Sequence, residues 1–145
     1  MPRHYIFVLT RTDALTIKGD GNANIRGGGA QSADDKVIQH NGKGTVTIDG
    51  FTVMDFGKLY RSCGNCKVSN ERHVVIKNVK AYNGKVLFGI NPNFKDNASI
   101  TGTCATSVKT ICEEFQGTKP GSEPKSISKG PSKTCVYTAS AIKAC

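Results

Sequence analysis

The sequence predicts an all-β protein built as a parallel β-solenoid, and two observations lead to this fold class. First, short runs that alternate apolar with polar residues recur along the chain, which is typical of β-strands. Second, these runs form two series that share one spacing, between 22 and 28 residues. A solenoid coil buries its apolar face only by stacking on its neighbours, so its strands are expected to recur at such a spacing.

The first series carries an isoleucine in every run. Its four members are Ala23-Asn24-Ile25-Arg26, Thr45-Val46-Thr47-Ile48-Asp49, His73-Val74-Val75-Ile76-Lys77 and Ala98-Ser99-Ile100-Thr101. Successive isoleucines are 23, 28 and 24 residues apart. We expect them to occupy equivalent positions in successive coils.

The second series opens each run with a lysine. Its members are Lys36-Val37-Ile38, Lys58-Leu59-Tyr60 and Lys85-Val86-Leu87, separated by steps of 22 and 27 residues. Residues one period apart stack on the same face, so the backbones of Lys36 and Lys58 should lie about 4.8 Å apart. The longer step coincides with residues 61–71, which we predict to be a loop that projects from one coil and is a place where function tends to sit.

Glycine and asparagine separate the strand runs. Gly27-Gly28-Gly29, Asn41-Gly42 and Asn83-Gly84 lie where left-handed backbone is needed for a turn. A β-sandwich is the alternative all-β fold, but its strand spacing of about 8 to 12 residues would not produce two series in one register.

The strand pattern fades from about Glu113. Residues 117–133 contain three prolines among Gly, Ser and Lys, a composition that buries little surface. We therefore expect an irregular C-terminal tail, residues 113–145, tied down by Cys112, Cys135 and Cys145. Helix is limited to a turn near residues 107–115.

The charge balance favours an acidic polymer as partner. Twenty Lys and Arg against eleven Asp and Glu give a formal charge of +9, which attracts polyanions. Aromatic residues are only 7% and Trp is absent, which argues against nucleic acid, and no apolar run is long enough to span a membrane. A row of lysines could also merely coat a solvated face.

Six cysteines indicate an oxidising compartment, and the glycosylation sequon Asn97-Ala98-Ser99 agrees with secretion. Their connectivity stays open, since 15 pairings are possible. We interpret Cys63-Gly64-Asn65-Cys66 as a local disulfide or a free pair rather than half a zinc site. The amino terminus has no apolar core of signal-peptide length, so we expect either no export or a missing beginning.

A longer motif identifies a resemblance. The residues from Asp55 to Cys66 read DFGKLYRSCGNC, and together with Ala33 to Gly42, Gly50 to Val53, Arg72 to Ile76 and Gly89 to Asn91 they resemble the family 3 pectate lyases. The likeness runs from about Thr12 to Cys145. It implies a right-handed parallel β-helix that lacks its first coils, secretion as a monomer, and calcium-dependent eliminative cleavage of polygalacturonate. Residues 12–112 would be a partial catalytic domain, and residues 1–11 do not match.

The resemblance also assigns site residues. Lys36, Lys58 and Arg61 match the family's active-site cations, and Asp13 matches the second acid of its Glu-Asp calcium pair, whose first acid is replaced here by Thr12. We expect Lys36 to be the base, with Lys58 and Arg61 binding uronate carboxylates.

The acidic and histidine residues near these cations have interpretations of their own. Asp34 and Asp35 could supply a metal ligand or orient Lys36, while His40 and His73 are expected to be structural. The rival function is a non-catalytic polygalacturonate-binding fragment without a complete calcium site.

Overall fold

The computed structural model of the chain describes residues 6–8 and 15–145, with side chains from residue 15 onward. Its strands are β1 (Ile6–Val8), β2 (Leu15–Ile17), β3 (Ala23–Arg26), β4 (Gly29–His40), β5 (Gly44–Asp49), β6 (Thr52–Ser62), β7 (Arg72–Lys77), β8 (Lys80–Ile90), β9 (Asn97–Thr101), β10 (Cys104–Gln116), β11 (Lys125–Lys129) and β12 (Cys135–Val136). Two short 3-10 turns, η1 (Pro92–Phe94) and η2 (Ala139–Ala141), complete the described elements.

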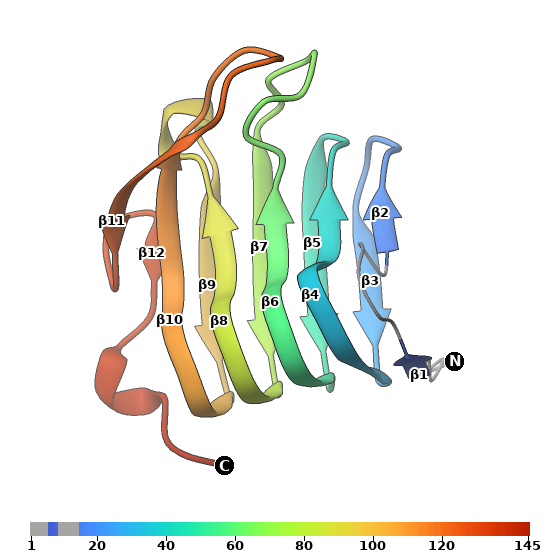
Figure 1. Cartoon of the computed structure of the whole chain (residues 1–145), viewed down its shortest axis with the longest axis vertical. Coiled ribbons are helices and arrows are strands. Elements are labelled where there is room, and N and C mark those ends of the chain that lie inside the picture. The colour runs from blue at the N-terminus through green and yellow to red at the C-terminus, as the bar shows by residue number, and fades with distance from the viewer. Residues whose placement is uncertain (1–5, 9–14) are drawn as a thin grey trace.

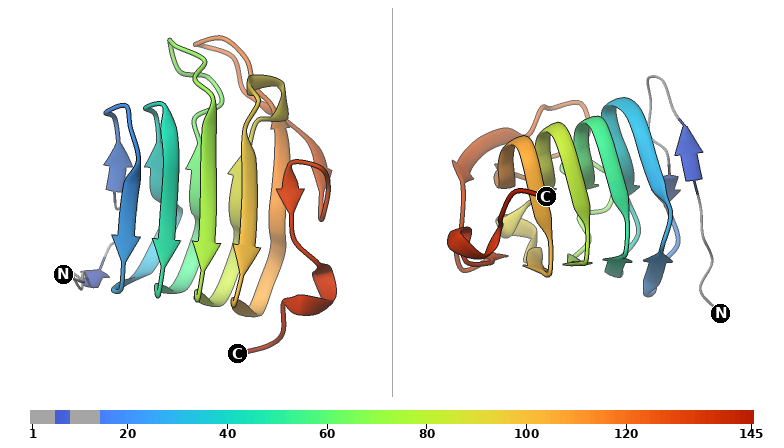
Figure 2. Two further views of the ribbon diagram at one scale, coloured as in Figure 1. Left: turned by 180° about the vertical axis from the view of Figure 1, so that it is seen from behind. Right: turned by 90° about the horizontal axis from the view of Figure 1, so that it is seen from below.

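The strands wind into a right-handed parallel β-helix (Figure 1). The spacing predicted a parallel solenoid, and the resemblance predicted its right hand. One sheet has seven strands in the order β1-β4-β6-β8-β10-β11, with β2 also paired to β4; the other has five, in the order β12-β9-β7-β5-β3. The chain passes from a short strand of the five-stranded sheet to a long strand of the seven-stranded sheet in every coil, which Figure 2 shows from behind and from below.

The predicted isoleucine series is confirmed in the register of the five-stranded sheet. Ile25 pairs with Ile48, Ile48 with Ile76, and Ile76 with Ile100. All four side chains are at most 7% exposed and form a ladder through the core. Stacking of identical apolar side chains removes them from water in every coil, which stabilises the repeat.

Left-handed residues turn the chain at two places in each coil. The first set follows the five-stranded sheet and consists of Gly27, Gly50, Asn78 and Gly102, with φ between 52° and 72°. The second set bends the long strands and consists of Ser32, Asp55, Asn83 and Ser107, with φ between 53° and 61°. The left-handed backbone predicted at Gly27 and Asn83 is confirmed. Glycine and asparagine tolerate this conformation better than other residues.

The turn predicted at Asn41-Gly42 differs in its details. Its left-handed residue is Gly44, with φ of 129°, rather than Asn41 or Gly42. Gly42 is needed for another reason, since a Cβ there would lie 2.1 Å from the carbonyl oxygen of Gly19 in the preceding coil.

The C-terminal segment contains more regular structure than its composition predicted. Residues 107–115 belong to strand β10 and not to the helical turn that the sequence predicted. Strand β11 pairs with β10 in the antiparallel direction, whereas the other strand pairs of the described residues are parallel. The six cysteines form three disulfides, Cys63–Cys66, Cys104–Cys145 and Cys112–Cys135. The disulfide-tied tail is confirmed, and so is a local bridge in the 63–66 motif.

Within the described ranges, no helix has the length and apolar character of a membrane span.

Candidate active site

The row of cations predicted from spacing lies on the seven-stranded sheet. Lys36 of β4 is directly opposite Lys58 of β6, while Arg61 of β6 is opposite Gln39 of β4. The third lysine of the series does not join them, because Val86 and not Lys85 is the partner of Lys58. Lys85 is exposed and lines a separate hollow with Asp34, Asp55 and Asn83.

A β-bulge places Lys36 in this row. Ala33 pairs with Phe56 and Lys36 pairs with Lys58, so β4 has one more residue than β6 between these two pairs. Gly57 accommodates the bulge, since a Cβ on it would lie 2.4 Å from the carbonyl oxygen of Asp34 and 2.3 Å from that of Asp35. Bulges change the direction of side chains in this way.

Asp35 also contacts the lysine that follows it. The Nζ of Lys36 donates a hydrogen bond to Oδ2 of Asp35 at 2.6 Å. The sequence left two roles open for Asp34 and Asp35, namely a metal ligand or the orientation of Lys36. This hydrogen bond from Lys36 to Asp35 fits the second role.

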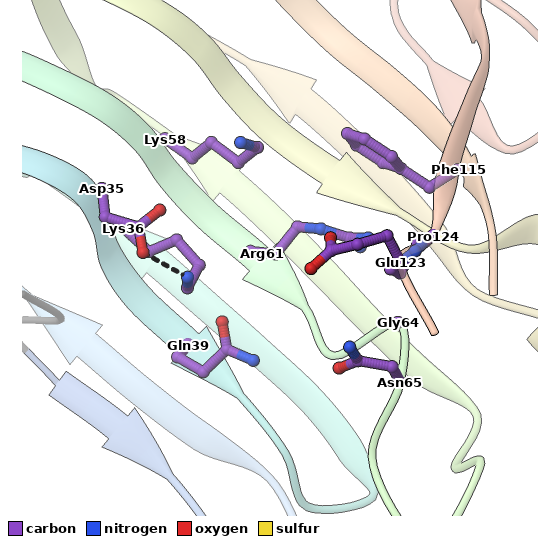
Figure 3. A pocket seen from close by; sticks show the side chains of 10 residues that line it. All are labelled: Asp35, Lys36, Gln39, Lys58, Arg61, Gly64, Asn65, Phe115, Glu123 and Pro124. Carbon is purple, nitrogen blue, oxygen red and sulfur yellow. Dashed lines mark hydrogen bonds and ion pairs between the residues drawn. The ribbon is translucent and has the colours of Figure 1, made fainter. Parts of the chain in front are cut away.

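The cations line a groove of about 380 Å³ on the outer surface of the solenoid (Figure 3). Its lining residues are Asp35, Lys36, Gln39, Lys58, Arg61, Gly64, Asn65, Phe115, Glu123 and Pro124. Gly64 and Asn65 come from the projecting loop predicted at residues 61–71, which begins after β6 ends at Ser62. The cationic side chains thus lie beside the projecting loop, and loops of this kind often carry functional residues.

Part of the groove comes from residues that sequence reasoning assigned to the tail. Phe115 lies near the end of β10, and Glu123 and Pro124 lie in the loop before β11. Two hydrogen bonds hold this loop against the 63–71 loop, from Thr118 N to Gly64 O at 2.7 Å and from Asn65 Nδ2 to Ser122 O at 3.0 Å. No repeat marks these residues in the sequence, so periodicity could not have found them.

Lys58 lies partly buried in the groove. Burial lowers the pKa of Lys58 from its usual 10.5, and the positive charge of Arg61 adds to the effect. Asp35 and Glu113 act in the opposite direction by attracting the protonated form. Lys58 therefore loses its proton at a lower pH than a solvated lysine does.

Arg61 is the most enclosed cation of the three. It is 8% exposed, and its Nη1 donates hydrogen bonds to Ser62 O and, at 3.0 Å, to Asn91 Oδ1. Burial lowers the pKa of Arg61 to about 10, so the guanidinium remains charged at neutral pH. A desolvated guanidinium is well suited to binding a carboxylate.

A buried polar network lies next to Arg61 and begins at its hydrogen-bond partner Asn91. Asn91 Nδ2 donates to Cys63 O at 3.1 Å, and Asp96 Oδ2 accepts from the backbone N–H of Asn91 at 2.9 Å. Asp96 Oδ1 accepts from the backbone N–H of Arg72, whose fully buried guanidinium donates to Cys63 O and to Asn41 O. Burial raises the pKa of Asp96 and lowers that of Arg72. The network fixes the base of the projecting loop.

His40 and His73, for which the sequence predicted a structural role, do not line the groove. His40 is fully buried, and its Nδ1 is 2.7 Å from the hydroxyl of Tyr60. His73 lies on the five-stranded sheet, where it contacts Asn97 and Glu71 at 2.7 Å and 3.0 Å.

The calcium ligand assigned from the resemblance, Asp13, lies outside the described residues. Within residues 15–145, no three His, Cys, Asp or Glu side chains come together where they could hold a metal ion. Calcium takes about 6 to 8 oxygen ligands, so the described residues do not fit this ion by themselves. The Cys63–Cys66 disulfide also removes the thiolates that a zinc site would need.

Taken together, these features define a parallel β-helix with a cationic groove on its outer face. The family described as pectate lyase matches residues 9–122, and the chain belongs to this family.

The relatives agree with this assignment. Pectate lyase H of Emericella nidulans is 63% identical over 129 residues, which cover 87% of this chain and 50% of that protein. Probable pectate lyase D of Aspergillus fumigatus is 62% identical over 128 residues, which cover 87% of this chain and 53% of that protein. The chain thus spans about half the length of the curated relatives it matches.

Solved structures share the fold. The catalytic domain of pectate lyase PelI from Erwinia chrysanthemi superposes with a TM-score of 0.81 at 30% identity, covering 92% of this chain and 66% of that domain. PelI in complex with tetragalacturonic acid gives a TM-score of 0.80 at 30% identity, covering 92% of this chain and 47% of that chain.

Proposed function

We propose that the groove binds polygalacturonate and that the protein is a pectate lyase, which cleaves (1→4)-α-D-galacturonan by β-elimination. The single observation that carries this proposal is the pairing of Lys36 with Lys58, beside Arg61, in one groove of a chain that belongs to the pectate lyase family. A polymer with one carboxylate on every sugar matches a groove with several cations. The tetragalacturonic acid bound to the structural relative PelI supports the same class of ligand.

The residue types fit an elimination reaction. A base removes the proton from C5 of a galacturonate unit, the electron pair forms the C4=C5 double bond, and the C4–O4 bond breaks. The departing oxygen remains with the neighbouring sugar and takes up a proton. Negative charge develops on the carboxylate attached to C5, so cations beside that carboxylate stabilise the transition state more than the ground state.

We assign the base to Lys36 and carboxylate binding to Lys58 and Arg61. Arg61, whose guanidinium remains largely protonated at neutral pH, is suited to binding a carboxylate. Lys58, whose pKa is lowered by burial, is the competing candidate for the base. Replacement of each lysine separately, as described below, distinguishes the two.

Calcium completes the proposal. When bound, the ion would neutralise uronate carboxylates and increase the acidity of the C5 proton. Asp13 is the ligand that the resemblance assigns in this chain, and the described residues do not form a calcium site by themselves. The steps above therefore name protein side chains only, and the calcium dependence of turnover is tested separately with a chelator.

We further propose an extracellular, monomeric protein. Its three disulfides persist in oxidising compartments. Asn97 of the sequon is exposed at the start of β9, where an acceptor asparagine would be accessible.

The test is a turnover assay of the chain on polygalacturonate. Elimination creates a double bond conjugated with the carboxylate, so ultraviolet absorbance should rise with time and should stop when a chelator is added. Oligogalacturonate binding is measured by calorimetry in parallel. Absence of any absorbance change, together with retained binding, would overturn the lyase proposal and favour the non-catalytic binding protein.

A further inference from the structure

The guanidinium of Arg61 is stacked on the aromatic ring of Phe115, a residue near the end of β10. The ring centre of Phe115 lies 4.1 Å from Cζ of Arg61 and 5.9 Å from Nζ of Lys58. Arg61 belongs to β6 and Phe115 to β10, with β8 between them in the sheet. Figure 3 shows both side chains on the groove side of the strands.

Gly89 of β8 makes room for this contact. It pairs with Arg61, and a Cβ on it would lie 3.0 Å from Cε2 of Phe115 and 3.1 Å from Cδ of Arg61. A side chain at this position would push the ring and the arginine apart. The stack therefore spans one coil by passing over a glycine.

The other sides of the guanidinium are also enclosed. Nη1 is held by Ser62 and Asn91, as described above. A Cβ on Gly64 would lie 2.7 Å from Nη2 of Arg61 and 2.6 Å from Cγ of Pro124. Arg61 thus has a ring against one face, one nitrogen engaged by acceptors, and the backbone of the projecting loop close to its second terminal nitrogen.

The C-terminal hairpin of β10 and β11 holds the ring in place. The β10–β11 register shifts between Glu114 and Phe115, so that Glu114 pairs with Ser128 and Phe115 with Ser126. The Cys112–Cys135 disulfide anchors β10 just before this irregularity. Hydroxyl donors on β11 bind the adjacent carboxylates, with Ser126 Oγ 2.6 Å from Glu113 Oε2.

We propose that Phe115 is a positioning residue of the groove, which fixes the plane of the Arg61 guanidinium so that its remaining donors meet a uronate carboxylate. Arginine has a long side chain with many rotamers, and an aromatic stack restricts them at a partly desolvated site. Positioning of this kind lowers the cost of binding because less motion is lost when the ligand arrives. The proposal rests on the proposed function in naming the carboxylate.

Substitutions of Phe115 test the proposal in the whole chain. Phe115→Ala is expected to weaken tetragalacturonate binding about tenfold, which corresponds to a cation–π stack at a desolvated site. Phe115→Tyr keeps the ring and should recover most of that affinity. Phe94→Ala is the matched control, because Phe94 packs against Gly117 outside the lining of the groove and should leave the affinity unchanged.

A double-mutant cycle separates positioning from a purely structural role. If Phe115 acts through Arg61, the losses from Phe115→Ala and Arg61→Gln should not add, because either change removes the same oriented guanidinium. If the two losses add, or if Phe115→Ala binds like the wild type while folding normally, the proposal is wrong.

A readout without ligand keeps this test independent of the lyase proposal. In NMR spectra, the Nε–H signal of Arg61 should be sharp in the wild type and in Phe115→Tyr, and it should broaden in Phe115→Ala. A wild type that binds but does not turn over polygalacturonate would overturn only the elimination reaction. Equal Nε–H signals in wild type and Phe115→Ala would overturn the positioning role.

Discussion

The two sheets of the solenoid differ in how strictly they repeat. In the five-stranded sheet, β3, β5, β7 and β9 pair without a shift of register, and the isoleucine ladder continues from Ile25 to Ile100. The seven-stranded sheet contains a bulge between β4 and β6 and another irregularity between β10 and β11. Both irregularities lie beside residues of the groove, Lys36 and Phe115.

This difference indicates a division of roles. The regular sheet contributes a ladder of buried side chains, so any single member should matter for stability and not for chemistry. The irregular sheet directs charged and aromatic side chains to one place on the surface, so its members should matter for function. Substitutions in the two sheets can break or sharpen this comparison.

The largest effect is expected from Lys36 in the irregular sheet. Lys36→Met should lower turnover of polygalacturonate by about 10² to 10⁴, since this is the usual contribution of a general base. Tetragalacturonate binding should change less than turnover. Lys85→Met makes the same change in the same sheet, one register position away from the row, and should leave turnover intact.

Lys58→Met completes that experiment. It should reduce affinity for tetragalacturonate more than it reduces the rate at saturation, because we assign Lys58 to binding. The reverse pattern, with Lys58→Met inactive and Lys36→Met active, would assign the base to Lys58.

The next effect is on stability and belongs to the regular sheet. Ile76 is fully buried between Ile48 and Ile100, so Ile76→Ala should destabilise the fold by about 2 to 5 kcal/mol. Urea denaturation followed by circular dichroism measures this. Val75→Ala, on the half-buried outer face of the same strand, should cost much less. Equal losses would mean that the ladder contributes nothing particular to stability.

Acid sensitivity should come from His40, which ends β4. Burial, with the positive charges of Arg72 and His73, lowers the pKa of His40 to about 4 from the usual 6.5. Its Nε2 has no hydrogen-bond partner among the described residues, so a protonated ring would leave an N–H without an acceptor. The unfolded chain therefore binds a proton in a pH range where the folded chain does not.

The sign of the pH effect follows from this difference. The stability linked to neutral His40 is fully present above about pH 6.5 and is lost as the pH falls toward 4, by up to about 3 kcal/mol. Unfolding experiments at pH 7 and pH 4.5 measure it. His40→Gln should show a shallower decline over this range, and an unchanged slope would contradict the assignment.

The smallest effect is expected at the bulge itself. Gly57→Ala places a Cβ against the carbonyl oxygens of Asp34 and Asp35, so we expect a loss of about 1 to 3 kcal/mol and a reduced turnover as Lys36 is displaced. Gly19→Ala is the matched control, because nothing lies within 4 Å of the added Cβ. A Gly57→Ala variant with wild-type stability and turnover would show that the bulge does not position Lys36.

The sequence by itself determined the coil repeat. Period-two alternation and a fixed spacing are local properties of the chain, and a solenoid stacks residues one period apart, so Ile48 and Lys58 could be assigned to neighbours in adjacent coils. The spacing alone does not extend the row to Lys85, because the register between β6 and β8 puts Val86 opposite Lys58. Left-handed turns were predicted at Gly27 and Asn83 for a local reason, the conformational freedom of these residue types.

Only the tertiary structure decided which residues complete the groove. Phe115, Glu123 and Pro124 lie in a segment of the chain without periodicity, and they reach Arg61 because a disulfide and two loop-to-loop hydrogen bonds fold that segment back over the coils. Contacts of this kind join residues 54 to 57 positions apart in the chain, namely Arg61 with Phe115, Gly64 with Thr118 and Asn65 with Ser122. Sequence patterns record local geometry and repeats, whereas such long-range contacts depend on the free energy of the whole fold.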